Sequence, residues 1–123
     1  MKIKIAYINL ALTAAILVVF AGQTAGQSVN EATWQTSVDD SQRGVVTLGV
    51  RDKWGTMGSF TAKFVATIGK KTYRGQMSSS QDNWAYIDFP REFQGSGPKA
   101  GTYRVTFYVK GVVIARDRFR YRP

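Results

Sequence analysis

The stretch from Gly101 to Tyr121, GTYRVTFYVKGVVIARDRFRY, alternates side chains of different character on both sides of Lys110-Gly111. Alternation with a period of two is typical of a half-buried strand, because successive side chains point to opposite faces. A short glycine-containing turn between two such runs predicts a β-hairpin. The face predicted to lie in the core holds Tyr103, Val105, Phe107 and Val109 on the first arm, and Val113, Ala115, Asp117, Phe119 and Tyr121 on the second.

The other face of this hairpin is rich in arginine. A planar guanidinium group suits bidentate recognition of carboxylate, phosphate or sulfate. The pattern therefore predicts a cationic binding surface with an aromatic side chain in its middle. The alternative is a solvated face whose charges discourage pairing with other strands. This face carries Arg104 and Tyr108 on the first arm and Val112, Ile114, Arg116, Arg118 and Arg120 on the second, with Arg122 continuing the same spacing.

Five earlier stretches are also predicted to be strands, and polar connections that contain glycine or proline separate them. They cover residues 33–38, 45–52, 59–68, 71–77 and 84–89. Beyond the N-terminal apolar run, no stretch keeps the apolar period of about 3.6 that a helix requires. Seven short strands with turn signals between them predict an all-β sandwich or barrel.

The N-terminal residues predict a secretory signal peptide. Lys2 and Lys4 precede an apolar run at 8–21, and small residues follow it. The run is shorter than the ~20 residues that span a bilayer, so an uncleaved anchor is only the alternative. Cleavage after Gly26 would release a single domain, 27–123, from the leader 1–26, and would place it in the periplasm or outside the cell. Gln23 stands where a bacterial lipoprotein carries its cysteine.

The composition is basic and lacks two chemically versatile residue types. Its 17 Lys and Arg face 8 Asp and Glu, a net charge of +9 that falls to +7 if Lys2 and Lys4 leave with the leader. A basic balance argues for an anionic partner and does not bear on the fold. The absence of Cys and His removes disulfides, thiolate nucleophiles and the commonest general base and metal ligand. We therefore expect no enzyme activity, no cofactor and no metal site.

The segment Pro98 to Val105, PKAGTYRV, resembles the start of the penultimate strand in immunoglobulin-like and fibronectin type III-like β-sandwich domains of bacterial secreted proteins. A Gly-x-Tyr-x-Val pattern there places the tyrosine of a tyrosine corner, whose hydroxyl bonds to nearby backbone. The resemblance implies this structural role for Tyr103, packed with Phe107 and Phe119. It implies a single immunoglobulin-like antiparallel β-sandwich of about seven strands. It also implies that the third predicted strand pairs with the first arm of the hairpin, which adds Lys63 to the cationic surface.

The tryptophans and the acidic loops are weaker leads. Trp34 and Trp84 fall in predicted strands, so we expect them in the core, and we expect Trp54 to close one end of the sandwich. The alternative for Trp54 is an exposed ring that stacks on a sugar. Asp39-Asp40 and Asp82-Asn83 lack the spacing of a calcium-binding loop and are interpreted as turn residues.

Together these features predict an exported binding or accessory module that docks an anionic partner on its basic strand face. The partner would be an anionic polymer of the envelope or extracellular space, such as an acidic glycan, or a lipid headgroup or an acidic protein; export argues against nucleic acid. A membrane would be met only through its headgroups. The alternative is a structural or assembly subunit that forms oligomers by pairing its C-terminal edge strand. A small hydrolase with two carboxylates is the third candidate, and nothing in the sequence nominates a pair. The expected binding residues are Arg104, Tyr108, Arg116, Arg118, Arg120 and Lys63.

Overall fold

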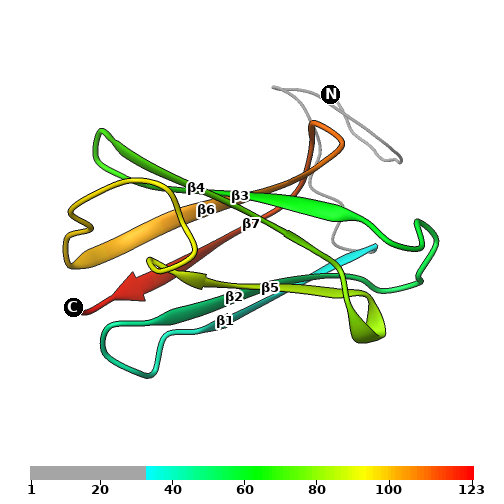
Figure 1. Ribbon diagram of the computed structural model, residues 1–123, viewed down its shortest axis with the longest axis horizontal. Coiled ribbons are helices and arrows are strands. Elements are labelled where there is room, and N and C mark those ends of the chain that lie inside the picture. Colours follow the sequence, from blue (N-terminus) through cyan, green and yellow to red (C-terminus); the bar gives the residue numbers. More distant parts are fainter. Residues whose placement is uncertain (1–32) are drawn as a thin grey trace, which may run out of the picture.

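The computed structural model describes residues 33–123, which fold into two antiparallel sheets packed face to face (Figure 1). The seven predicted strands are all present and no α-helix occurs in this part of the chain, so the all-β prediction is confirmed. The predicted leader, 1–26, lies outside the described residues. Within 33–123, nothing qualifies as a helix of membrane-spanning length and hydropathy.

One sheet has three strands and the other has four. The three-stranded sheet has the order β1 (Trp34–Asp39), β2 (Val46–Asp52), β5 (Trp84–Phe89). The four-stranded sheet has the order β4 (Lys71–Ser78), β3 (Thr61–Ile68), β6 (Gly101–Val109), β7 (Val112–Tyr121). The hairpin predicted from the opening stretch is β6–β7, and β3 pairs with β6 on its other side, as expected.

The core between the sheets is rich in aromatic rings. Phe89 on β5 is fully buried, and its ring centroid lies 5.0 Å from that of Tyr103 and 4.9 Å from that of Phe119. Tyr103 and Phe119 are partners in the β6–β7 ladder, and their rings stack at 5.0 Å. Aromatic pairs contribute about 0.5–1.5 kcal/mol each beyond their buried area. The inner face of the hairpin is thereby fixed to the opposite sheet.

The Tyr103 hydroxyl is a polar group buried beside these rings. The side chain is 0% exposed, and its hydroxyl donates to the backbone carbonyl of Lys99 at 2.7 Å. This is the contact that the sequence resemblance implies for Tyr103. Burial, reinforced by the neighbouring Tyr73, raises the pKa of Tyr103 above its ordinary value of 10.0.

The β6–β7 turn consists of Lys110 and Gly111, because Val109 pairs directly with Val112. Their φ angles are 53° and 76°, and two positive values are what a type I′ hairpin turn requires. Glycine adopts such angles freely, whereas a side chain such as that of lysine opposes them. The hairpin therefore keeps a cation at its tip in an unfavourable backbone conformation.

A β-bulge changes one part of the predicted alternation. The β6–β7 register shifts between Phe107 and Tyr108. Ile114 and Ala115 are consequently both buried, at 7% and 4% exposed, while Val113 lies opposite Tyr108. The prediction that Ile114 faces outward and Val113 inward is wrong, because one extra residue in a strand reverses the alternation of its side chains.

Candidate functional site

The outer face of the four-stranded sheet, called the basic face from here on, gathers six exposed cations from all four strands. The strand register arranges the outward side chains in rows that cross the sheet. On these strands, all of which the structure describes, no Asp or Glu has an outward position. The six cations are Lys63, Arg74, Arg104, Arg116, Arg118 and Arg120.

Two arginines of the basic face lie directly opposite each other. Arg104 on β6 is the ladder partner of Arg118 on β7, and the Cβ atoms of such partners are about 5 Å apart. Arg116 and Arg120 flank Arg118 at steps of about 6.8 Å along the strand. None of these four guanidinium groups forms an ion pair with a carboxylate of residues 33–123. Positive charge therefore accumulates on this face without a direct ion pair to these guanidinium groups.

Arg74 belongs to the basic face although reasoning from the sequence did not select it. Arg74 is the partner of Val65 on β3, whose other neighbour, Thr106, is the partner of Arg116. One row therefore has an arginine at each edge of the sheet. The signal was present in the sequence, because the tight turn between β3 and β4 sets a register that puts Arg74 on the same face as Lys63.

Lys63 and Tyr108 are direct partners in the next row, and Tyr108 is half-buried. At this end of the basic face a groove opens beside the β6–β7 turn. No carboxylate lines it, and the Thr61 and Ser78 hydroxyls lie 3.1 Å apart within it. The positive charge thus continues from the strands to the hairpin tip. The groove is lined by Ser59, Phe60, Thr61, Lys63, Ser78, Val109, Lys110 and Gly111.

The side chain of Arg122 does not join the three arginines that follow one another along β7. Its guanidinium group donates to the carbonyl oxygens of Asp40 and Ser41 in the β1–β2 turn, at 3.4 and 2.9 Å. The backbone carbonyl of Arg122 also accepts a hydrogen bond from the amide of Gly44 at 2.6 Å. Arg122 therefore joins β7 to the other sheet.

The outer edges of the four-stranded sheet are partly covered. On β7, the amides of Arg118 and Arg120 donate to the carboxylates of Asp117 and Asp40, both at 2.8 Å. On β4, Arg74 and Gln94 exchange two backbone hydrogen bonds, at 3.1 and 2.7 Å. A strand from another molecule would have to displace these contacts before it could pair.

The outer face of the three-stranded sheet carries a stack of side chains. The rings of Trp84 and Tyr86 are 5.0 Å apart and nearly parallel, and the Arg51 guanidinium lies 5.9 Å from the centre of Trp84. Tyr86 covers Gly49, where an added Cβ would come within 2.6 Å of the ring. The prediction that Trp84 lies in the core is therefore wrong. It is half-buried on the outer face, because Ala85 and the alternate residues after it point inward.

Of the other two tryptophans, one lies in the core as predicted and the other does not. Trp34 is 8% exposed and contacts the ring of Phe60 at 5.2 Å, so its predicted place in the core is confirmed. Trp54 is 70% exposed, so the prediction that it closes one end of the sandwich is wrong. The loop after β2 carries its ring outward rather than over the core.

Asp52 at the end of β2 is a buried carboxylate that reasoning from the sequence did not single out. It is 0% exposed, and its Oδ2 accepts from the amide of Met57 at 3.0 Å. Its Oδ1 has no hydrogen-bond partner within residues 33–123. No group of three or more acidic residues that could hold a metal occurs in the same range. Asp52 therefore ties down the loop after β2.

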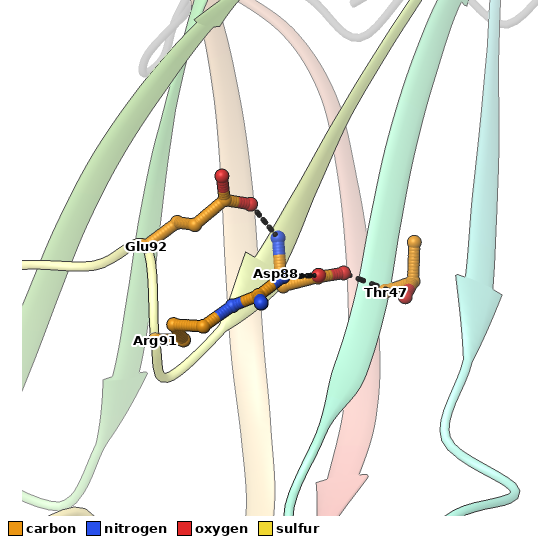
Figure 2. Close-up of polar contacts among 4 residues, drawn as sticks. All are labelled: Thr47, Asp88, Arg91 and Glu92. Atoms are coloured by element: carbon orange, nitrogen blue, oxygen red, sulfur yellow. Dashed lines mark hydrogen bonds and ion pairs between the residues drawn. The ribbon is translucent and has the colours of Figure 1, made fainter.

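A polar cluster closes the end of β5 (Figure 2). The Asp88 carboxylate accepts from the Thr47 hydroxyl at 2.8 Å and pairs with Arg91. The Asp88 amide donates to the Glu92 carboxylate at 2.7 Å, and the Glu92 amide donates to the Asp88 carbonyl at 2.9 Å. These contacts hold the connection after β5 against the edge of that strand, so they have a structural use.

Comparison of the chain with known protein families, with curated proteins and with solved structures finds no match. The geometry and charge of the basic face are therefore the features that point to a function.

Proposed function

We propose that this protein is an exported, non-enzymatic binding module that docks an anionic partner on the basic face. The observation that carries the proposal is the opposed pair Arg104 and Arg118, flanked by two more arginines on a face without outward carboxylates. Like charges directly opposite destabilise a sheet, and a mixture of signs would keep a surface soluble. An anion between these guanidinium groups would remove the repulsion and add charge-assisted hydrogen bonds.

We also propose that the sandwich is of the immunoglobulin-like or fibronectin type III-like kind. Two features support this assignment. The last two strands form a hairpin in the sheet that also holds the third strand, and the opposite sheet contains the first, second and fifth strands. The buried Tyr103 hydroxyl donates to backbone four residues upstream, as a tyrosine corner does.

The contacts along β7 favour this function over assembly by strand pairing. The outer amides of Arg118 and Arg120 already have carboxylate acceptors, so an added strand would gain little hydrogen bonding there. A hydrolase is disfavoured because neither the basic face nor the groove beside it supplies the two carboxylates that glycoside hydrolysis uses.

The test replaces Arg116, Arg118 and Arg120 with serine. We expect the variant to fold, because all three side chains are exposed. We expect its affinity for anionic probes to fall roughly 10-fold or more at low salt, where surface charges are least screened. The probes are acidic polysaccharide, anionic vesicles and an acidic protein, and binding is measured by calorimetry.

A matched control removes three charges from connections outside the basic face, by serine at Arg43, Lys70 and Lys99. This control should bind nearly as well as the wild type. If the basic-face variant also bound every probe as the wild type does, the proposal would be wrong.

A further inference from the structure

We infer that the anionic partner is a linear acidic polysaccharide whose chain lies along β7, with carboxylate or sulfate groups against Arg116, Arg118 and Arg120. This inference rests on the proposed function. It narrows the partner from any anion to one class of polymer and gives that polymer a direction on the sheet.

The direction follows from the spacing of the cations. Along β7, three arginines recur every about 6.8 Å and together cover about 14 Å. Arg104 stands beside the middle one. Across the sheet, by contrast, the row that contains Arg74 and Arg116 has the uncharged residues Val65 and Thr106 between them. A chain with regularly spaced charges would meet more cations along β7 than across the strands.

The surroundings of the cations suit a carbohydrate. Hydroxyl groups lie between the arginines and beside them, and each hydroxyl both donates and accepts hydrogen bonds, as sugar hydroxyls do. Thr102 is the ladder partner of Arg120, and Thr106 is the partner of Arg116. Thr67 lies on the other side of Arg104, with Thr72 beyond it. The basic face therefore alternates charge with neutral hydrogen-bonding groups.

Other anionic partners need features that the basic face lacks. The core of a protein interface combines arginine with exposed aromatic residues and methionine, and a membrane-surface protein inserts an apolar face. None of the large exposed apolar side chains among residues 33–123 lies among the six cations: they are Trp54 and Met57 in the loop after β2, Tyr86 on β5 and Val112 at the hairpin tip. Single-stranded nucleic acid stacks its bases on open aromatic rings, whereas Tyr108 is half-buried.

Two further cations lie near the hairpin tip, separated from Arg116 by the uncharged end of β7. Beyond Arg116, β7 runs to the turn that holds Lys110, and Lys110 and Lys63 both line the groove there. A polymer longer than the distance from Arg116 to Arg120 would therefore reach these two cations. Binding should accordingly strengthen with chain length beyond the oligomer that first covers the three arginines.

The experiment measures binding of galacturonic acid and of oligogalacturonates of increasing length to the full chain by calorimetry. The monosaccharide should not bind measurably, and affinity should rise steeply with length, because linked contacts act at high effective concentration. Three probes of other classes are measured beside them: phosphatidylglycerol vesicles, polyglutamate with the same number of carboxylates, and oligothymidylate. Each of these should bind more weakly than the matched oligogalacturonate.

Two single substitutions test the direction. Arg118→Ser removes the middle one of the three arginines on β7. Arg74→Ser removes a cation from the same face, on β4 at the opposite edge of the sheet. Arg118→Ser should lower the affinity for long oligomers roughly 5-fold or more, because it removes a contact with a carboxylate of the polymer. Arg74→Ser should lower it less than 2-fold, because Arg74 lies away from β7.

The outcomes separate this inference from the proposed function. Affinity that is independent of oligomer length, or tighter binding to vesicles, polyglutamate or oligothymidylate, would overturn the polysaccharide while leaving anion docking intact. Equal losses from Arg118→Ser and Arg74→Ser would overturn the direction along β7. If the triple serine variant bound all probes like the wild type, the proposed function would fall as well.

Discussion

Tyr103 shows how one hydroxyl fixes the segment that leads into the hairpin. The ring is sealed in the core, and the hydroxyl has a single backbone acceptor, the carbonyl of Lys99, at 2.7 Å. Burial raises the pKa of Tyr103 above 10.0 in the folded protein. An acid whose folded pKa is raised stabilises the fold below its unfolded pKa, and this contribution is lost as the pH rises through the folded value.

Tyr103→Phe should therefore cost about 1 kcal/mol of stability at neutral pH, the typical value of one net hydrogen bond. The difference between wild type and variant should shrink above the ordinary tyrosine pKa of 10.0, because only the wild type loses the neutral hydroxyl at this position. Urea unfolding at a series of pH values measures both effects. A difference that grew with rising pH would contradict the assigned direction of the pKa.

Lys110 gives a second prediction, because its backbone φ of 53° suits asparagine better than lysine. Lys110→Asn should raise the free energy of unfolding by a few tenths to about 1 kcal/mol. Gly111→Ala, at a φ of 76°, should lower it and serves as the control of opposite sign. Urea unfolding measures both changes. A less stable Lys110→Asn protein would show that the lysine side chain makes a stabilising contact at the tip.

The two sheets are joined along β1 and β7 by side chains rather than by a backbone ladder. The Thr36 hydroxyl donates to the Asp117 carboxylate at 2.7 Å, across 81 residues of sequence. The same carboxylate accepts from the amide of Arg118. This explains why an acidic residue occupies an inward position on β7, next to the most basic surface of the molecule.

A double-mutant cycle on this contact tests its contribution. Thr36→Val and Asp117→Ala should each destabilise the fold, with a coupling energy of about 1–2 kcal/mol, because the hydrogen bond involves a charged acceptor. Thr61→Val provides the matched control, since its hydroxyl lies in an exposed pair with Ser78. If the effects of Thr36→Val and Asp117→Ala were additive, the hydrogen bond between these two side chains would contribute nothing to stability.

At the level of strands, the sequence predicts where the strands lie but does not predict the β-bulge within one of them. Alternation placed all seven strands within a few residues, since one face of each is buried. The bulge that buries Ile114 could not be predicted, because it arises from the register between β6 and β7 rather than from β7 alone. Arg74 differs from Ile114 in this respect, because the tight turn between β3 and β4 fixes its register against β3 and its face can be inferred from the sequence.

For the molecule as a whole, the basic face should lower stability when no partner is bound. Its cations are mutually close, and the chain carries a net charge of +9. Raising the salt from about 0.01 to 0.1 M shortens the Debye length from about 30 to about 10 Å. The melting temperature of the wild type should therefore rise with salt, as measured by calorimetry.

The variant with serine at Arg116, Arg118 and Arg120 should show a smaller rise than the wild type. The control with serine at Arg43, Lys70 and Lys99 should keep most of the rise, because those positions lie in connections between strands. Equal rises in the two triple variants would mean that the repulsion is spread over the whole surface rather than concentrated on the basic face.

The partial cover on three of the four strand edges has a consequence for crowding. A long polymer that gathers many copies would raise their local concentration far above that of the surrounding solution. Sheets with open edges would then fuse into fibrils. Here Asp40, Gln94 and Glu92 occupy backbone groups on β7, β4 and β5. Neighbouring copies on the polymer would pair less readily through these three edges, and a rise in salt would release them from the polymer.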